Sequence, residues 1–166
     1  VVQREVPLAD WPQLEAIADR FDTRELTHAE ALAELDSPGL LPLPESALGL
    51  RSGLVLQVKD ALTRVIDDAL GAAEADVERH IGDRDFDQAE AACGERLDAI
   101  LRARTGFVDI AALPAGTSLL HAEQWRNEER DAVGAARRGA VREARAALRR
   151  AYPVEVTERV DALVAE

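Results

Sequence analysis

Residues 118–151 constrain the fold more than any other stretch, because their apolar side chains recur with the period of an α-helix. One broad side of the expected helix carries Leu119, Ala122, Trp125, Ala132, Val133, Ala136, Ala140, Ala144, Ala147, Leu148 and Ala151. The opposite side carries Asn127, Asp131, Arg138, Arg142, Arg145 and Arg149. A stripe held over about nine turns predicts a rod of roughly 50 Å. We expect this helix to be the longest in the chain and the rest of the molecule to pack along it.

Two further amphipathic runs predict long helices over residues 52–81 and 86–104. The side chains expected to line the apolar face of the first are Leu54, Val58, Leu62, Val65, Ile66, Ala69, Ala73 and Val77. Those expected to point inward from the second are Phe86, Ala89, Cys93, Leu97, Ile100 and Leu101. The turn over 82–85 is short enough to make the two helices antiparallel. Gly106 follows the second helix, where glycine commonly ends a helix in the left-handed conformation.

Two shorter helices are expected near the N-terminus. Asp10 is placed to cap a helix over 11–20, because its carboxylate can accept from the first free backbone N–H groups. Thr27 and Glu30 have the spacing of a capping box, which predicts a helix that runs to about Leu35.

The remaining segments are connections and an outlying helix. We expect residues 1–9 to form an extended arm, and residues 37–51 to form a proline-containing strap whose leucines fill a groove between helices. A last amphipathic helix is expected over 156–164. The predicted fold class is therefore all-α: one domain over 1–166, built as an elongated bundle of three long helices and two or three short ones.

The overall composition is that of an acidic, soluble, globular protein. Hydrophobic residues make up 47% of the chain and charged residues 31%, and the formal net charge is −12. No apolar run approaches the ~18–20 residues that a membrane span requires, and no stretch resembles a signal peptide. The negative charge argues against nonspecific binding to nucleic acid or to an anionic membrane. The single cysteine, Cys93, fits a reducing compartment, so we expect a cytoplasmic protein.

The charges are unevenly distributed along the chain. Residues 1–116 contain 11 basic and 23 acidic side chains, whereas residues 117–166 contain 9 of each. An arginine-rich helix beside an acidic remainder indicates an internally complementary fold. The alternative is a docking face for an acidic partner.

Asp76 and His80 form the first candidate pair of polar residues, one helical turn apart and both near the middle of the apolar face of their helix. Burial without partners would cost about 1–3 kcal/mol for each group. The pair fits an acid–base site, a pH-sensitive contact or half of a metal site. The structural alternative is that the helix leaves the core here and both side chains form an ordinary, half-exposed contact.

Glu129 is the second candidate, because it falls on the apolar side of the long helix near Arg126, Arg130 and Arg137. A buried glutamate bridged by arginines would fix helix register or partner choice. An exposed edge position and a catalytic carboxylate with a raised pKa are the alternatives. We also expect Trp125 and the residues as far as Ala136 to lie in or beside an interface between subunits.

The standard motifs of catalytic and metal sites are missing from the sequence. There is no glycine-rich phosphate loop, no G-x-S-x-G, no H-E-x-x-H and no paired E-x-x-H. His28 is expected as a neutral surface residue in the first turn of its helix, His121 on a polar face, and Cys93 as a small core residue. We therefore expect no catalytic residue, no bound cofactor and no metal site.

The leading functional hypothesis is a non-enzymatic helical module for protein–protein contact, which forms a homo-oligomer or binds another protein. A long bundle exposes much side surface relative to its core. A second hypothesis is the small-molecule-binding sensory domain of a regulator. That function would need an apolar cavity, and only 4% of the residues are aromatic. A helical enzyme without a standard motif is the third hypothesis.

Overall fold

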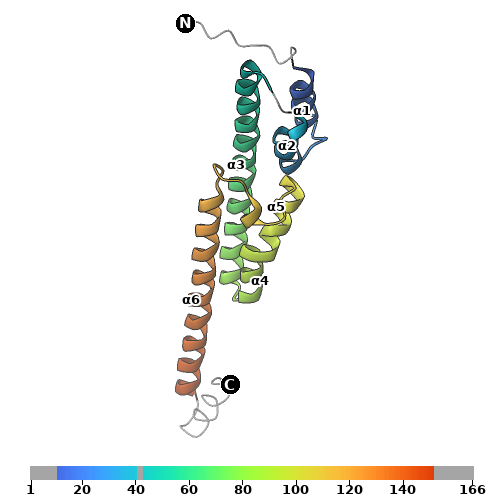
Figure 1. Cartoon of the computed structure of the whole chain (residues 1–166). Coiled ribbons are helices and arrows are strands. Elements are labelled where there is room, and N and C mark those ends of the chain that lie inside the picture. The colour runs from blue at the N-terminus through green and yellow to red at the C-terminus, as the bar shows by residue number, and fades with distance from the viewer. Residues whose placement is uncertain (1–10, 41–42, 152–166) are drawn as a thin grey trace.

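The computed structural model describes residues 11–40 and 43–151, which contain helices and connecting turns but no strand (Figure 1). The expectation of an all-α fold is confirmed. The α-helices are α1 (Pro12–Asp22), α2 (His28–Leu35), α3 (Glu45–Gly82), α4 (Phe86–Ala91), α5 (Leu97–Thr105) and α6 (Leu119–Ala151). Short 3-10 turns cover Pro38–Leu40 and Ile110–Ala112, and a π-helical turn covers Ala92–Arg96.

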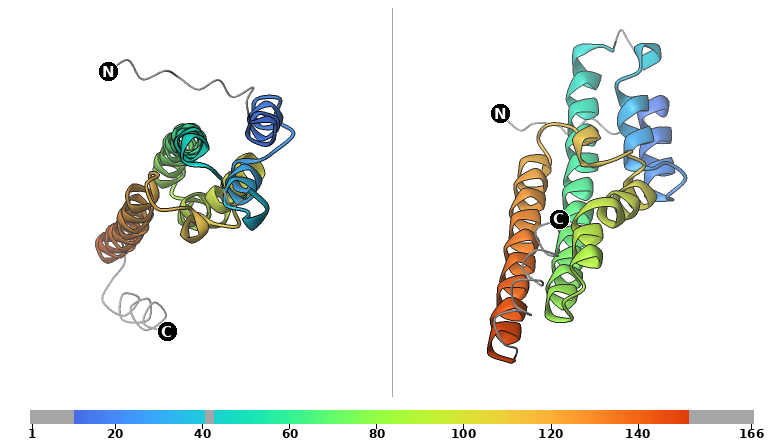
Figure 2. Two further views of the ribbon diagram at one scale, coloured as in Figure 1. Left: turned by 45° about the horizontal axis from the view of Figure 1, so that its top comes forward. Right: turned by 90° about the horizontal axis from the view of Figure 1, so that it is seen from below.

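The central element is α3, not the helix over 118–151 that we expected to organise the fold. At 38 residues α3 is longer than α6, which has 33. It packs against α2 along its N-terminal half and against α4, α5 and α6 along its C-terminal half (Figures 1 and 2). The physical reason is area, because α3 buries leucine, valine and isoleucine, whereas the stripe of α6 is mostly alanine.

α6 runs in the same direction as α3 and antiparallel to α4 and α5, as the colour gradients in Figure 1 show. Its C-terminal part extends beyond the turn that joins α3 to α4 (Figures 1 and 2). Only Ala122, Trp125 and Val133 of this helix are buried. Most of its surface therefore faces solvent.

Two hydrophobic clusters share α3. The first joins its C-terminal half to α4, α5 and α6, and its largest fully buried side chains include Leu62, Ile66, Leu97 and Leu101. The second joins its N-terminal half to α1 and α2 through Leu14, Ile17, Leu26, Ala31, Leu35, Leu40, Leu54 and Val58. Leu32 packs against both clusters.

The start of α3 differs from the prediction, which placed a strap over 37–51. The helix begins at Glu45 directly after Pro44, and Ala47 in its first turn is completely buried. A proline immediately before the first turn is compatible with a helix start, because it donates no hydrogen bond there. Leu40 is buried as expected of a strap residue. Residues 41 and 42 lie outside the described part of the chain.

The helix expected over 86–104 is interrupted by the π-helical turn, within which Gly94 has φ −111° and ψ −108°. The buried side chains of Ala89, Cys93, Leu97 and Leu101 are spaced four residues apart. On an α-helix, four residues advance about 400°, so such a row drifts round the helix. The wider turn partly corrects this drift. Ile100, expected inward, is 37% exposed, because the buried row of α5 passes through Leu97, Leu101 and Thr105.

Two helix ends agree closely with their sequence signals. Thr27 and Glu30 form the expected capping box, and Gly106 ends α5 in the left-handed conformation at φ +82°. Trp11 occupies the N-cap position of α1, with proline in its first turn. Asp10, the arm over 1–9 and the helix expected over 156–164 lie outside the described residues. Within the described ranges, no helix is both long enough and apolar enough to cross a membrane.

Candidate functional site

Asp76 and His80 are both half-buried on α3. Among the described residues, their hydrogen-bond partners are arginines, and the predicted contact between the two is not found. The guanidinium of Arg79 donates to Asp76 at 2.7 Å. The Nε2 atom of His80 lies 3.3 Å from a guanidinium nitrogen of Arg79 and 3.4 Å from one of Arg96. Since guanidinium groups only donate, a hydrogen bond in either contact would have Nε2 as its acceptor. This arrangement is the half-exposed structural alternative, with arginine rather than histidine as the partner of Asp76.

Glu129 is not bridged by the arginines near it on α6. Burial raises the pKa of its carboxyl group above the ordinary value, and the charges of Glu74, Glu78 and Glu128 raise this pKa further. Arg126 and Arg137, which we expected to meet Glu129, pair with aspartates instead. Glu129 is therefore a partly buried carboxylate beside three others.

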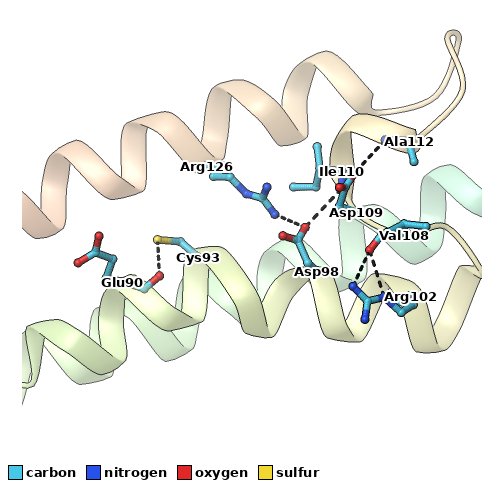
Figure 3. Close-up of polar contacts among 9 residues, drawn as sticks. All are labelled: Glu90, Cys93, Asp98, Arg102, Val108, Asp109, Ile110, Ala112 and Arg126. Carbon is cyan, nitrogen blue, oxygen red and sulfur yellow. Dashed lines mark hydrogen bonds and ion pairs between the residues drawn. The ribbon is translucent and has the colours of Figure 1, made fainter.

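Arg126 forms an ion pair with Asp98 that links α6 to α5 (Figure 3). The two side chains are only 16% and 25% exposed. The same carboxylate oxygen of Asp98 accepts from the backbone N–H of Ile110 at 3.4 Å, so it also holds the 3-10 turn of the connector (Figure 3). Breaking a partly buried pair of this kind leaves a charge without compensation. Arg126 is thus a structural residue of the bundle.

Arg137 lies over the turn between α3 and α4. It forms an ion pair with Asp87, and its guanidinium carbon lies 6.0 Å from the centre of the Phe86 ring, within reach of a cation–π contact. The neighbouring Arg84 pairs with Glu143 at 3.0 Å. These contacts fix the middle of α6 against the tip of the α3–α4 hairpin.

Trp125 is 9% exposed and belongs to the hydrophobic cluster of α3, α4, α5 and α6. Its indole ring therefore contributes to the core of its own chain. The prediction that the surrounding section of α6 contacts a second subunit stays untested, but it can no longer rest on Trp125.

Cys93 is completely buried in the π-helical turn, and its thiol donates to the carbonyl oxygen of Glu90 at 3.3 Å (Figure 3). Burial raises the pKa of the thiol, and the nearby charge of Arg130 lowers it by a smaller amount. A buried thiol with a raised pKa is a poor nucleophile. No group of His, Cys, Asp or Glu side chains within the described ranges is arranged to hold a metal ion.

An exposed row of side chains runs along α6 on the side away from α3 and α4. We call this row the outer stripe; it consists of Gln124, Glu128, Asp131, Ala135, Arg138, Arg142 and Ala146. Every member is exposed, and the spacing of three or four residues keeps them on one side of the helix. The charged members before Ala135 are acidic, and those after it are basic.

A cavity of about 600 Å³ lies where the α1–α2 connection and the start of α2 meet α3 and the end of α5. We call it the His28 cavity; its polar lining residues are Asp22, Arg24, Thr27, His28 and Arg104. The imidazole of His28 makes an edge-to-face contact with Phe21, with 5.2 Å between ring centres. Burial lowers the pKa of His28, and the carbonyl group of Arg104 partly offsets this effect.

The sequence did not single out the residues of this cavity. His28 was expected as an ordinary surface residue, and Arg104 follows it by 76 positions. The two segments meet because Gly106 approaches Thr27 so closely that a Cβ atom on Gly106 would lie 2.5 Å from the threonine hydroxyl. The capping box at Thr27 and the glycine after α5 are both visible in the sequence, but nothing local indicates that they touch.

Comparison with known proteins found no matching protein-family model, no similar curated protein and no similar solved structure.

Proposed function

We propose that this protein is a non-enzymatic helical interaction module that self-associates through the outer stripe of α6. In the proposed dimer two α6 helices lie antiparallel and cross at Ala135. A two-fold axis makes such an interface isologous, so each contact occurs twice.

The charge order of the outer stripe carries this proposal. In an antiparallel pair centred on Ala135, residues equally far before and after the centre face each other. Glu128 then faces Arg142 of the second copy, and Asp131 lies near Arg138 of the second copy. Each acidic half therefore meets a basic half, which is the complementarity that guides register and partner choice.

Two further features of the molecule favour the same arrangement. Ala132, Ala135 and Gly139 surround the crossing point, and small side chains let helix axes approach closely. With a net charge of −12, two copies repel each other over most of their surface. Contact is favoured where the arginine-rich half of α6 meets acidic side chains.

The experiment is a charge swap measured by molar mass in solution, using light scattering over a range of protein concentrations. Glu128→Arg and Arg142→Glu should each weaken dimerisation by about tenfold, because each places like charges at two symmetric contacts worth up to about 1 kcal/mol apiece. The double variant restores opposite charges and should recover most of the affinity.

Arg64→Glu is the matched control, since Arg64 is exposed on α3 and lies outside the outer stripe. It should leave the dimer affinity close to that of the unmodified chain. A monomeric mass for the unmodified protein at tens of micromolar, or a double variant as weak as the two single variants, would exclude the proposed dimer.

A further inference from the structure

We propose that the His28 cavity binds a small organic anion, a carboxylate or a phosphate ester, whose charged group lies near Arg24 and Arg104. This site is separate from the proposed dimer contact, because no residue of α6 lines the cavity. The volume of about 600 Å³ lies within the roughly 300–1,000 Å³ typical of small-molecule sites.

The two arginines make the charged part of the cavity basic. No ion pair of either Arg24 or Arg104 is found within the described residues, although six other arginines of those ranges pair with carboxylates. The cavity lining includes one acidic side chain, Asp22. Guanidinium groups are well suited to carboxylate and phosphate, because each presents several N–H donors in a fixed plane.

The backbone holds Arg24 at the cavity in an unusual conformation, with φ +62°. The backbone N–H groups of Glu25 and Leu26 both donate to the carbonyl of Arg20, at 2.8 and 3.1 Å, and so close the connection tightly. Arginine seldom adopts left-handed backbone angles, whereas asparagine does so more readily. Asparagine can therefore replace Arg24 with the turn retained.

His28 adds a polar atom that is buried and unsatisfied. Its Nδ1 has no hydrogen-bond partner within the described residues and is shielded from solvent. Because Nδ1 has no exposed surface, it is not itself a contact for a ligand, and His28 contributes through the charge that its ring gains on protonation. An anion beside the ring stabilises the protonated imidazole, which opposes the effect of burial on the pKa of His28.

The rest of the lining is apolar and comes from Phe21, Leu26, Val65 and Ala103. A fully hydrated inorganic ion gains nothing from such a wall. An organic anion with an aromatic or aliphatic body gains from removing that surface from water. The mixed lining therefore favours an organic anion over inorganic phosphate.

The experiment is a titration of the full chain with phenyl phosphate, benzoate and inorganic phosphate, monitored by NMR of the histidine side chains. The chain contains three histidines, of which His80 and His121 lie outside the cavity and serve as internal references. The resonances of His28 should shift saturably with phenyl phosphate or benzoate, and those of the two references should not. Inorganic phosphate should bind more weakly than phenyl phosphate.

Two variants test the arginines. Arg24→Asn and Arg104→Gln should each weaken phenyl phosphate binding by about tenfold, since each removes a charge-assisted contact. Arg64→Gln removes the same charge from an exposed position on α3 that does not line the cavity, and should change the affinity less than about twofold, because solvent and salt screen it. Unchanged shifts of the reference histidines report that each variant is folded.

Absence of a saturable His28 shift with all three anions would overturn the proposed site. The proposed site would also be overturned if Arg24→Asn, Arg104→Gln and Arg64→Gln bound phenyl phosphate with equal affinity. The His28 shift would then reflect a general attraction of the anion to the protein surface. Equal binding of inorganic phosphate and phenyl phosphate would overturn the assignment of the ligand as organic.

Discussion

The carboxylate of Glu129 lies among other carboxylates, although arginines precede and follow it along α6. Side-chain direction explains this difference, because Arg126 reaches Asp98 and Arg137 reaches Asp87 on neighbouring elements. Glu129 instead faces the side of α3 that carries Glu74 and Glu78. The result is a raised pKa that is caused first by burial and then by like charges.

Replacing Glu129 with glutamine should stabilise the protein at neutral pH. A carboxyl group whose folded pKa is raised binds its proton more readily in the folded state. Its favourable contribution is therefore complete below the ordinary value of 4.5 and is lost as the pH rises through the folded pKa. At neutral pH Glu129→Gln should remove a repulsion of about 0–1 kcal/mol, the scale of partly solvated charges.

Urea unfolding followed by circular dichroism, at neutral pH and again below 4.5, measures this effect. The gain should shrink towards zero at the lower pH, where glutamate and glutamine are both neutral. Glu123→Gln, at an exposed position on the same helix, is the control and should give no comparable gain. A stabilisation of Glu129→Gln that is equal at both pH values would contradict the electrostatic cause.

The position of the end of α5 depends on one residue, Gly106. Gly106 ends the helix at φ +82°, and its backbone N–H donates to the carbonyl of Arg102 at 3.0 Å. A Cβ atom at this position would lie 2.5 Å from the hydroxyl oxygen and 2.9 Å from the Cβ atom of Thr27. Left-handed backbone and close approach both require glycine here.

Gly106→Ala and Gly71→Ala should have opposite effects on stability. The first introduces backbone strain and a contact with Thr27, and should destabilise the fold by about 1–3 kcal/mol. The second lies within α3 with open space around its Cα, and should stabilise the fold by roughly 0.5–1 kcal/mol, because alanine favours helix more than glycine does. Thermal or urea unfolding of both variants measures the difference. If Gly106→Ala left the free energy of unfolding unchanged, α5 would not end against α2 as described.

At the scale of the whole molecule, α3 joins two hydrophobic clusters that have few other connections. Leu14 is completely buried in the cluster with α1 and α2, and Leu97 is completely buried in the cluster with α4, α5 and α6. Proteins open locally in cooperative units of this kind, and each unit has its own free energy of opening. The two ends of the molecule should therefore respond separately to core substitutions.

Leu14→Ala should speed amide hydrogen exchange in α1 and α2 much more than in α4 and α5, and Leu97→Ala should do the reverse. Each substitution should lower stability by about 2–5 kcal/mol, the usual range for a leucine removed from a core. Hydrogen exchange followed by mass spectrometry resolves the helices individually. Equal acceleration at both ends in either variant would show that the clusters unfold as one unit.

Local signals in the sequence predicted the elements well. Periodic apolar residues predicted α3 and α6, the Thr27–Glu30 pair predicted the start of α2, and Gly106 predicted the end of α5. These features depend on residues within a few positions of one another, so a short segment of the sequence is enough to predict each of them. The π-helical turn was missed because Cys93 and Leu97 keep helical spacing on both sides of Gly94, the residue whose backbone angles depart from a helix.

The sequence by itself determined the all-α class, the start of α2 and the end of α5. Only the tertiary structure decided that α3 is central, that Arg126 pairs with Asp98 instead of Glu129, and that His28 and Arg104 line one cavity. Helix formation follows from side chains three and four positions apart. Packing and ion pairing depend on which helices lie side by side, and the competition between distant partners is settled by buried area and by the direction of each side chain.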